Sequence, residues 1–223
     1  MRNITLIVAG GSCTRFGAAR PKQFLLLNGK PVLQHTLEAF ATASDEIILV
    51  LPQAHHDLWR QLCIDYHCNV PHHVVTGGDT RWQSVKNAID TLKVLPGDVI
   101  AVQDGVRPLV SGKVIDQAFA IARQCGSAVP VVAVTDSIRQ VEDDGTSHIV
   151  PRSVLRAVQT PQAFNAVELK AAYDRPYLPV YTDDASVYEL AGHPVTLIDG
   201  ETTNIKITHP SDLLLAENIL KHE

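Results

Sequence analysis

Short apolar runs alternate with helix-length segments along most of this chain, and that alternation limits the possible fold more than any other feature. The runs are dense in Val and Ile, which is typical of strands covered on both faces of a parallel sheet. They span residues 4–9, 46–51, 73–75, 99–102 and 128–134. The segments between them have helical length and spacing, and they span residues 32–41, 54–66, 81–92 and 114–124.

This order of elements predicts an α/β fold built on a doubly wound, mostly parallel, Rossmann-like sheet. Strands that alternate with helices are joined by right-handed crossovers, which place helices on both faces of the sheet. In such sheets the ligand lies beyond the carboxyl ends of the strands. We therefore expect the chemistry in the loops that follow residues 9, 75, 102 and 134.

Length and composition favour one domain over residues 1–223. A chain of 223 residues with 45% hydrophobic composition can bury a sizeable core. No apolar run approaches the roughly 18 residues of a membrane span, and no secretory signal precedes the first strand. The net charge of -5 argues against a nucleic-acid partner. We therefore expect a cytoplasmic protein without nucleic-acid or membrane partners.

The four cysteines, Cys13, Cys63, Cys68 and Cys125, form no C-x-x-C pair. In a cytoplasmic chain the default state of such residues is a reduced thiol. His67 lies beside Cys68, but its spacing to the cysteines matches no zinc-binding pattern. We expect free thiols here and no metal site.

A polar segment at residues 136–153 interrupts the alternation and predicts a β-hairpin arm. Asp144-Gly145 separates two β-prone stretches, residues 137–141 and 148–150, as in many tight hairpins. A lone two-stranded hairpin is marginally stable in water. The arm must therefore pack on its own domain or on a second subunit, and dimerisation with substrate contact is its expected role.

The loop after the first strand has the composition of a phosphate-binding loop. Gly10 and Gly11 let the backbone approach a phosphate closely and point N–H groups at it. Arg15 and Lys22 follow and add cationic charge. The loop is neither a Walker A motif nor a G-x-G-x-x-G motif, so it indicates a phosphate site of another kind.

The loop after residue 75 begins Gly77-Gly78-Asp79-Thr80 and opens a helix. Its glycines expose backbone groups that can read the edge of a base, and Ser84 adds a hydroxyl from the first helical turn. Asp79 or Thr80 is also a candidate N-cap of that helix, which is compatible with base recognition.

The loop after residue 102 contains Asp104 and Arg107. A carboxylate at the carboxyl end of a strand, beside a triphosphate, suits magnesium, which takes one or two carboxylates plus phosphate oxygens. Arg107 can pair with Asp104 or hold the substrate. Lys206 stands in an apolar stretch, where a buried Lys needs a partner.

Taken in order along the whole chain, these loops resemble the 2-C-methyl-D-erythritol 4-phosphate cytidylyltransferase family. The resemblance also rests on Arg152 and on residues 159–162, 182–186 and 204–208. It implies a nucleotidyltransferase of the non-mevalonate isoprenoid pathway that joins CTP to the sugar-alcohol phosphate and releases pyrophosphate. It further implies a magnesium ion and a homodimer whose arm reaches into the partner's site.

The resemblance assigns roles residue by residue. Arg15 and Lys22 are the implied catalytic residues, which stabilise the transferring phosphoryl group. The implied CTP cradle consists of Ala9, Gly10, Gly11, Gly78, Asp79 and Ser84. The implied substrate-binding residues are Asp104, which also binds the metal, Arg107, Ser137, Arg152, Thr160 and Lys206. Arg152 and Lys206 are the pair that would grip the substrate phosphate.

The chain departs from the family pattern in two loops. Cys13 stands where the first loop usually has Gly, and Gln103-Asp104-Gly105 replaces the usual His-Asp-Ala. A ribitol 5-phosphate cytidylyltransferase shares most of these loops, but the spacing from Arg152 to residues 159–162 favours the isoprenoid enzyme. A non-catalytic nucleotide-binding regulator on the same fold is a further alternative, which the presence of Lys22 and Asp104 disfavours.

Overall fold

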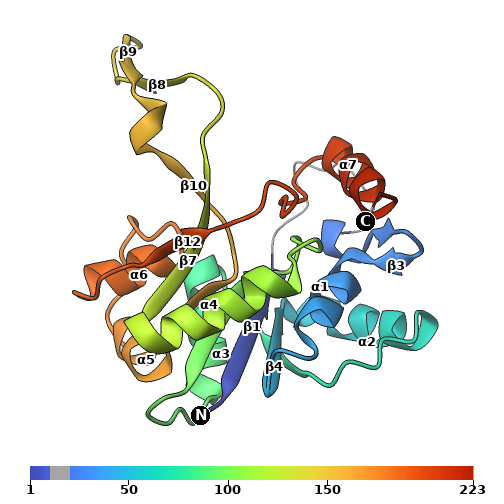
Figure 1. Cartoon of the computed structure of the whole chain (residues 1–223). Coiled ribbons are helices and arrows are strands. Elements are labelled where there is room, and N and C mark those ends of the chain that lie inside the picture. The colour runs from blue at the N-terminus through green and yellow to red at the C-terminus, as the bar shows by residue number, and fades with distance from the viewer. Residues whose placement is uncertain (11–20, 223) are drawn as a thin grey trace.

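The apolar runs form five strands of the main sheet, as predicted (Figure 1). The computed structural model describes residues 1–10 and 21–222. Within them the main sheet has eight strands, seven in the order β10-β7-β11-β6-β1-β4-β5, and β12 pairs with β7. The predicted runs become β1 (Asn3–Val8), β4 (Glu46–Leu51), β5 (His73–Thr76), β6 (Val99–Asp104) and β7 (Ser127–Ala133).

One antiparallel strand divides the sheet. β11 (Gln162–Asn165) lies between β6 and β7 and runs antiparallel to both. β10 (Arg156–Val158) is antiparallel to β7 at the edge, whereas β12 (Leu197–Asp199) is parallel to it. β1 is parallel to both β4 and β6, and β4 is parallel to β5. The prediction of a doubly wound, mostly parallel sheet is confirmed, and the inserted strand was not foreseen.

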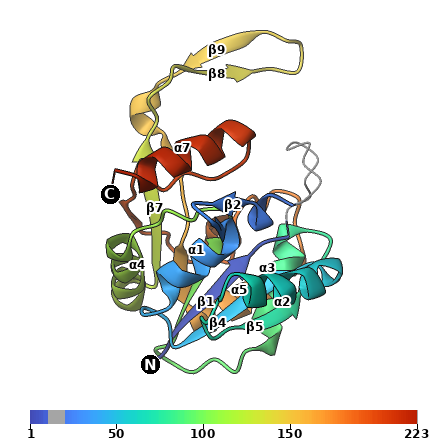
Figure 2. The same cartoon turned by 90° about the vertical axis from the view of Figure 1, so that its right-hand side faces the viewer.

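Two helical layers cover the sheet (Figures 1 and 2). Successive side chains of a strand point to opposite faces, so Leu49 packs in one apolar cluster and Ile48 in the other. The first cluster includes α1 (Val32–Phe40), α2 (His56–Asp65) and α4 (Gly112–Cys125). The second includes α3 (Arg81–Thr91), α5 (Ala166–Tyr173) and α6 (Asp184–Leu190). Each fully buried Leu or Ile contributes about 1.5–3 kcal/mol to this core.

Short polar caps fix where the helices begin beside the strand ends. Thr80 caps α3, because its hydroxyl accepts a hydrogen bond from the Gln83 N–H at 3.0 Å. This settles the choice between Asp79 and Thr80 in favour of Thr80. Ser111 caps α4 in the same way through the Val114 N–H. Each such cap stabilises its helix by about 1 kcal/mol.

The polar segment forms the predicted hairpin arm, which protrudes from the rest of the chain (Figures 1 and 2). β8 (Ile138–Val141) pairs antiparallel with β9 (Ser147–Val150), and Gly145 takes a positive φ of 83° in the turn between them. The 3-10 turn Arg152–Val154 follows at the base of the hairpin.

The C-terminal helix α7 (Pro210–Leu220) packs over a third apolar cluster beside the small hairpin of β2 (Leu26–Leu27) and β3 (Lys30–Pro31). Among the helices of the described chain, none is long and apolar enough to cross a membrane.

Candidate active site

The loops singled out in the sequence begin side by side at one edge of the sheet. Ala9 follows β1 and donates its N–H to the Val50 carbonyl at 3.0 Å. Gly105 follows β6 and donates to the Val8 carbonyl at 2.9 Å, so the ends of β1 and β6 are level. Gly77, after β5, donates to the Leu51 carbonyl. The site therefore lies at the carboxyl ends of the parallel strands, where a ligand is expected.

Two predicted parts of the CTP cradle meet at Ser84. A Cβ built on Gly10 would lie 3.8 Å from the Ser84 hydroxyl, and one on Gly77 would lie 3.0 Å from it. That buried hydroxyl accepts a hydrogen bond from the Gly78 N–H at 3.1 Å and donates to the Thr80 carbonyl at 2.9 Å. The buried Ser84 hydroxyl thus fixes the backbone of residues 78–80, while Gly78 and Asp79 are exposed to solvent.

Lys22 is tied to the phosphate loop by its neighbour. It opens a 3-10 turn, Lys22–Phe24, in which Gln23 is buried. The Gln23 amide donates a hydrogen bond to the Ala9 carbonyl at 2.8 Å, which fixes the turn against the end of β1. Sequence reasoning missed this role of Gln23. Gly11, Arg15 and Cys13, which belong to the same loop, lie outside the described residues.

Asp104 is the last residue of β6 and is surrounded by cations. Its Oδ2 lies 3.0 Å from Lys206 Nζ and 3.3 Å from Arg107 Nε, and its Oδ1 lies 3.8 Å from Arg81 Nε. The Asp104 side chain is 11% exposed. Burial by itself would raise the pKa of the Asp104 carboxyl, but Arg81, Lys206 and Arg107 together hold this pKa below its ordinary value. Asp104 is therefore an anion at neutral pH.

A hydrogen-bonded frame holds this cluster in place. The Thr160 hydroxyl accepts a hydrogen bond from the Asp104 N–H at 3.1 Å. The buried Asn204 side chain donates to the Thr160 carbonyl at 2.9 Å, and the Asn204 carbonyl accepts from Arg107 at 2.8 Å. The structure thus brings Asp104, Arg107, Thr160 and Lys206 together, as the sequence predicts. The neighbours of Lys206 in the chain, Ile205 and Ile207, pack in an apolar cluster, and Lys206 has the partner that the sequence called for, although 42% of its side chain is exposed.

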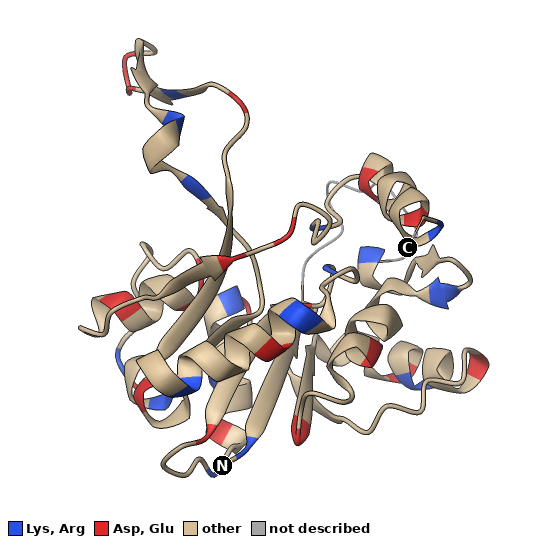
Figure 3. Ribbon diagram, in the orientation of Figure 1, with Lys and Arg blue, Asp and Glu red and all other residues tan. Residues whose placement is uncertain are grey.

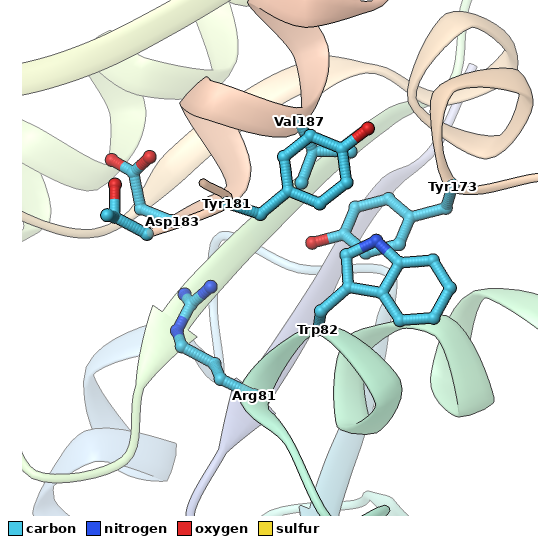
Figure 4. A pocket seen from close by; sticks show the side chains of 7 residues that line it. Arg81, Trp82, Tyr173, Tyr181, Asp183 and Val187 are labelled. Atoms are coloured by element: carbon cyan, nitrogen blue, oxygen red, sulfur yellow. The ribbon is translucent and has the colours of Figure 1, made fainter. Parts of the chain in front are cut away.

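Arg81 is a member of the site that the sequence reasoning missed. It is the first residue of α3, and its Nη2 lies 2.5 Å from Oδ2 of the fully buried Asp184. Figure 4 shows Arg81 on α3 pointing toward the α6 side of a small pocket that Tyr173 also lines. Burial opposes the charge of Arg81, yet Asp184 raises the guanidinium pKa above its ordinary value. A cation at a helix N-terminus opposes the helix dipole, and this was the available signal for a carboxylate partner.

The arm residues lie apart from this cluster. Ser137 and Arg152 are exposed, and within the described residues no contact joins either of them to Asp104 or Lys206. Arg152 instead donates to the Thr135 carbonyl at the base of the arm. Figure 3 shows basic residues along the arm. One chain therefore does not bring the predicted phosphate-gripping pair together.

The described residues of the site fit a magnesium ion that is bound jointly with a triphosphate, and not one held by protein side chains alone. Across residues 1–10 and 21–222, no group of three or more His, Cys, Asp or Glu side chains could enclose a metal. Asp104 offers one carboxylate at the end of β6, level with the end of β1. Because magnesium is commonly bound by one or two carboxylates together with substrate phosphates, this donor set fits an ion that arrives with a triphosphate.

Comparison with known proteins gives one consistent result. The family model for 2-C-methyl-D-erythritol 4-phosphate cytidylyltransferase matches residues 4–222. A protein of that name from Porphyromonas gingivalis is 50% identical over 221 residues, with 98% of each chain covered. One from Bacteroides thetaiotaomicron is 46% identical, covering 99% of this chain and 100% of the relative. The crystal structure of the Thermus thermophilus enzyme is similar with a TM-score of 0.79 at 32% identity, covering 99% and 100%.

Proposed function

The chain belongs to the 2-C-methyl-D-erythritol 4-phosphate cytidylyltransferase family, and on this basis we propose how its residues carry out the reaction. The enzyme is a nucleotidyltransferase of isoprenoid precursor synthesis. It joins CTP to 2-C-methyl-D-erythritol 4-phosphate and releases 4-CDP-2-C-methyl-D-erythritol and pyrophosphate. The observation that carries the site assignment is the convergence of the glycine loops and the Asp104 cluster at one edge of the sheet.

The reaction is a single in-line displacement. An oxygen of the sugar phosphate forms a bond to the α-phosphorus of CTP while the bond from that phosphorus to the pyrophosphate oxygen breaks. No covalent intermediate with the protein is needed, so catalysis consists of positioning and of stabilising negative charge. Lys22, fixed beside Ala9 by Gln23, and Arg15 supply that charge stabilisation.

The nucleotide lies between the two glycine loops. Ala9 and Gly10 would face the triphosphate, and Gly11 is proposed to belong to the same cradle. The close approach of Gly10 to Ser84 brings Gly10 to the base-reading loop, residues 77–80. Gly78 and Asp79 are exposed and offer backbone groups to the cytosine edge. Ser84 keeps that loop in shape through its two hydrogen bonds.

Asp104 would hold magnesium together with the phosphates of CTP, and the ion would neutralise charge on them. Lys206 and Arg107 lie within 3.3 Å of the Asp104 carboxylate, so the sugar phosphate would dock against the same cluster. The Thr160 hydroxyl holds the backbone of Asp104 in place by accepting a hydrogen bond from its N–H. This arrangement brings the attacking phosphate next to the triphosphate.

The arm completes the site of a second subunit in a homodimer. Its hairpin exposes Val141 and Ile149 at 68% and 74% of their surface, and the 3-10 turn at its base exposes Val154 at 76%. A two-stranded hairpin is marginal by itself, and exchange of an element across a two-fold axis is a common route to a dimer. Arg152 and Ser137 would then contact the sugar phosphate of the partner subunit, opposite Lys206.

A coupled assay of pyrophosphate release tests the proposal. Purified enzyme is given CTP, UTP, ATP or GTP with 2-C-methyl-D-erythritol 4-phosphate or with ribitol 5-phosphate, and magnesium is removed by chelation in a parallel series. We expect turnover with CTP, the methylerythritol phosphate and magnesium. Turnover with ribitol 5-phosphate alone, or undiminished turnover after chelation, would refute the corresponding part.

A further inference from the structure

Arg81 joins three elements that meet only at the site. It follows the base-reading loop as the first residue of α3, and it contacts Asp104 at the end of β6 and Asp184 at the start of α6. We propose that Arg81 is a positioning residue, which fixes the Asp104 carboxylate relative to the base-reading loop by anchoring both on buried Asp184. This inference rests on the proposed role of Asp104.

The anchor is rigid because it is buried and fully engaged. Asp184 has no exposed surface, and both of its oxygens are bound: Oδ2 to Arg81 at 2.5 Å and Oδ1 to the Tyr173 hydroxyl at 2.6 Å. A buried carboxylate is retained only with a cationic or hydrogen-bonding partner. Tyr173 is itself buried against α3 and α6, so Asp184 has little freedom to move.

The planar guanidinium transmits this rigidity to Asp104. Its Nη2 is held by Asp184, which fixes the plane of the guanidinium and with it the position of Nε, 3.8 Å from Asp104 Oδ1. Lys206 and Arg107 both contact Oδ2 of Asp104, whereas Arg81 lies beside Oδ1. At 3.8 Å the Arg81 contact is too long for a hydrogen bond. Arg81 therefore acts on Oδ1 through its charge, which favours the rotation of the carboxylate that keeps Oδ1 toward the guanidinium and leaves Oδ1 able to accept a ligand.

The role also couples nucleotide binding to the chemical step. The base-reading loop ends in Thr80, which caps α3 immediately before Arg81. A displacement of this loop therefore moves the cation that faces Asp104.

The test removes the anchor without leaving a buried unpaired charge. The double variant Arg81→Gln with Asp184→Asn neutralises both partners and keeps polar groups of similar size. The matched control is Lys86→Gln with Asp174→Asn, which removes an exposed ion pair of 3.1 Å made by the same helix. Steady-state kinetics, thermal unfolding and a crystal structure are compared for the parental enzyme and both doubles.

We expect the Arg81 double to lose at least about 30-fold in kcat and to raise KM for CTP, because the base-reading loop loses its anchor, with KM for the sugar phosphate changed by less than about threefold. The control should keep kcat within about twofold. If the Arg81 double folds and retains parental kcat, Arg81 only neutralises Asp184 and the inference is wrong.

Arg81→Lys covers the case in which the double variant does not fold. It keeps a cation for Asp184, but one ammonium group lacks the fork that reaches two carboxylates. We expect parental melting within a few degrees, a kcat at least about 10-fold lower, and an Asp104 carboxylate rotated from its parental orientation. An unrotated Asp104 would overturn the inference. Because that readout needs no turnover, it is independent of whether the proposed reaction is correct.

Discussion

At the scale of single residues, the site depends on cations held in fixed positions around one carboxylate and one loop. Asp104 has Lys206 and Arg107 on one oxygen and Arg81 beside the other. Lys22 is positioned differently, by a neighbour that grips the backbone of Ala9. These contacts connect residues far apart in the chain, which explains why spacing alone identified some of them and missed others.

Lys22→Ala should lower kcat by about 10²- to 10³-fold, which is the usual cost of removing one preorganised group that stabilises the transition state, the role that we propose for Lys22. Circular dichroism and melting should stay near parental. Lys30→Ala is the control, because Lys30 forms an exposed ion pair with Glu38 close by in the chain. A Lys22 variant within a few-fold of parental kcat would remove Lys22 from the catalytic assignment.

CTP should be preferred to UTP by about 10- to 100-fold in kcat/KM. Groups of the base-reading loop that suit the cytosine amine and ring nitrogen would be mispaired by uracil, at a cost of about 1–3 kcal/mol each. Ser84→Ala should narrow this preference, because the loop loses the hydroxyl that bonds Gly78 and Thr80. Equal kcat/KM for the two triphosphates in the parental enzyme would contradict the assignment of the loop.

The lowered pKa of Asp104 predicts how stability depends on pH. A carboxyl whose folded pKa lies below its unfolded value of about 3.9 contributes stability above that pH and loses it as pH falls through the folded pKa. Urea unfolding should therefore show a wider gap between parental protein and Asp104→Asn at pH 7 than at pH 3. Asp90→Asn, at an exposed pair with Lys86, should show a small gap at both values. A stability difference between the parental protein and Asp104→Asn that is larger at pH 3 than at pH 7 would contradict the lowered pKa of Asp104.

At the scale of elements, the ends of β1 and β6 approach so closely that the loop after β6 needs glycine. A Cβ on Gly105 would lie 2.7 Å from the Ala9 Cβ and 3.1 Å from Leu33. Gly105→Ala should therefore destabilise the protein by about 1–3 kcal/mol in urea unfolding. Gly112→Ala, where a Cβ would meet nothing within 4 Å, should be neutral or slightly stabilising. If the two substitutions change the free energy of unfolding equally, the neighbours of Gly105 can shift to admit a Cβ, and the close approach does not require glycine.

Most of the longer strands and helices in the first 134 residues follow from apolar patterning, because they bury continuous apolar surface. The short β2 and β3 were not predicted, and β5 was predicted although it is largely exposed at the edge of the sheet. β6 runs on to Asp104, beyond the apolar run, since Gln103 and Asp104 are buried polar residues that the pattern hides. The antiparallel insertion of β11 could not be predicted from its four residues, whose pairing depends on where the chain returns. The hairpin arm was predictable because its Asp-Gly turn is a local signal.

Among the site residues, those on glycine loops or at strand ends were predictable from sequence. Arg81 and Asp184 were not paired in advance, because they are 103 positions apart and each also suits a helix end. Gln23 and Asn204 act through backbone carbonyls, and no local pattern marks such partners.

At the scale of the whole molecule, the arm is the part that one chain cannot explain. It exposes apolar side chains and carries Arg152 away from Lys206, although both are expected to bind the same phosphate. We therefore expect each active site to be built from two chains. A bidentate Arg contact to a phosphate is charge-assisted, so Arg152→Ala should raise KM for the sugar phosphate and leave KM for CTP nearly unchanged.

Mixing two variants, at a sugar-phosphate concentration so low that each alone has little activity, distinguishes a shared site from one built within a single chain. Arg152→Ala and Lys206→Ala chains are combined, and subunit exchange is confirmed by mass spectrometry of differently tagged chains. If the sites are shared, each mixed dimer has one site with both defects and one with neither, so up to about a quarter of parental activity should return. If Arg152 acts within its own chain, every site keeps one defect, and a mixture that exchanges subunits yet regains no activity would contradict the shared site.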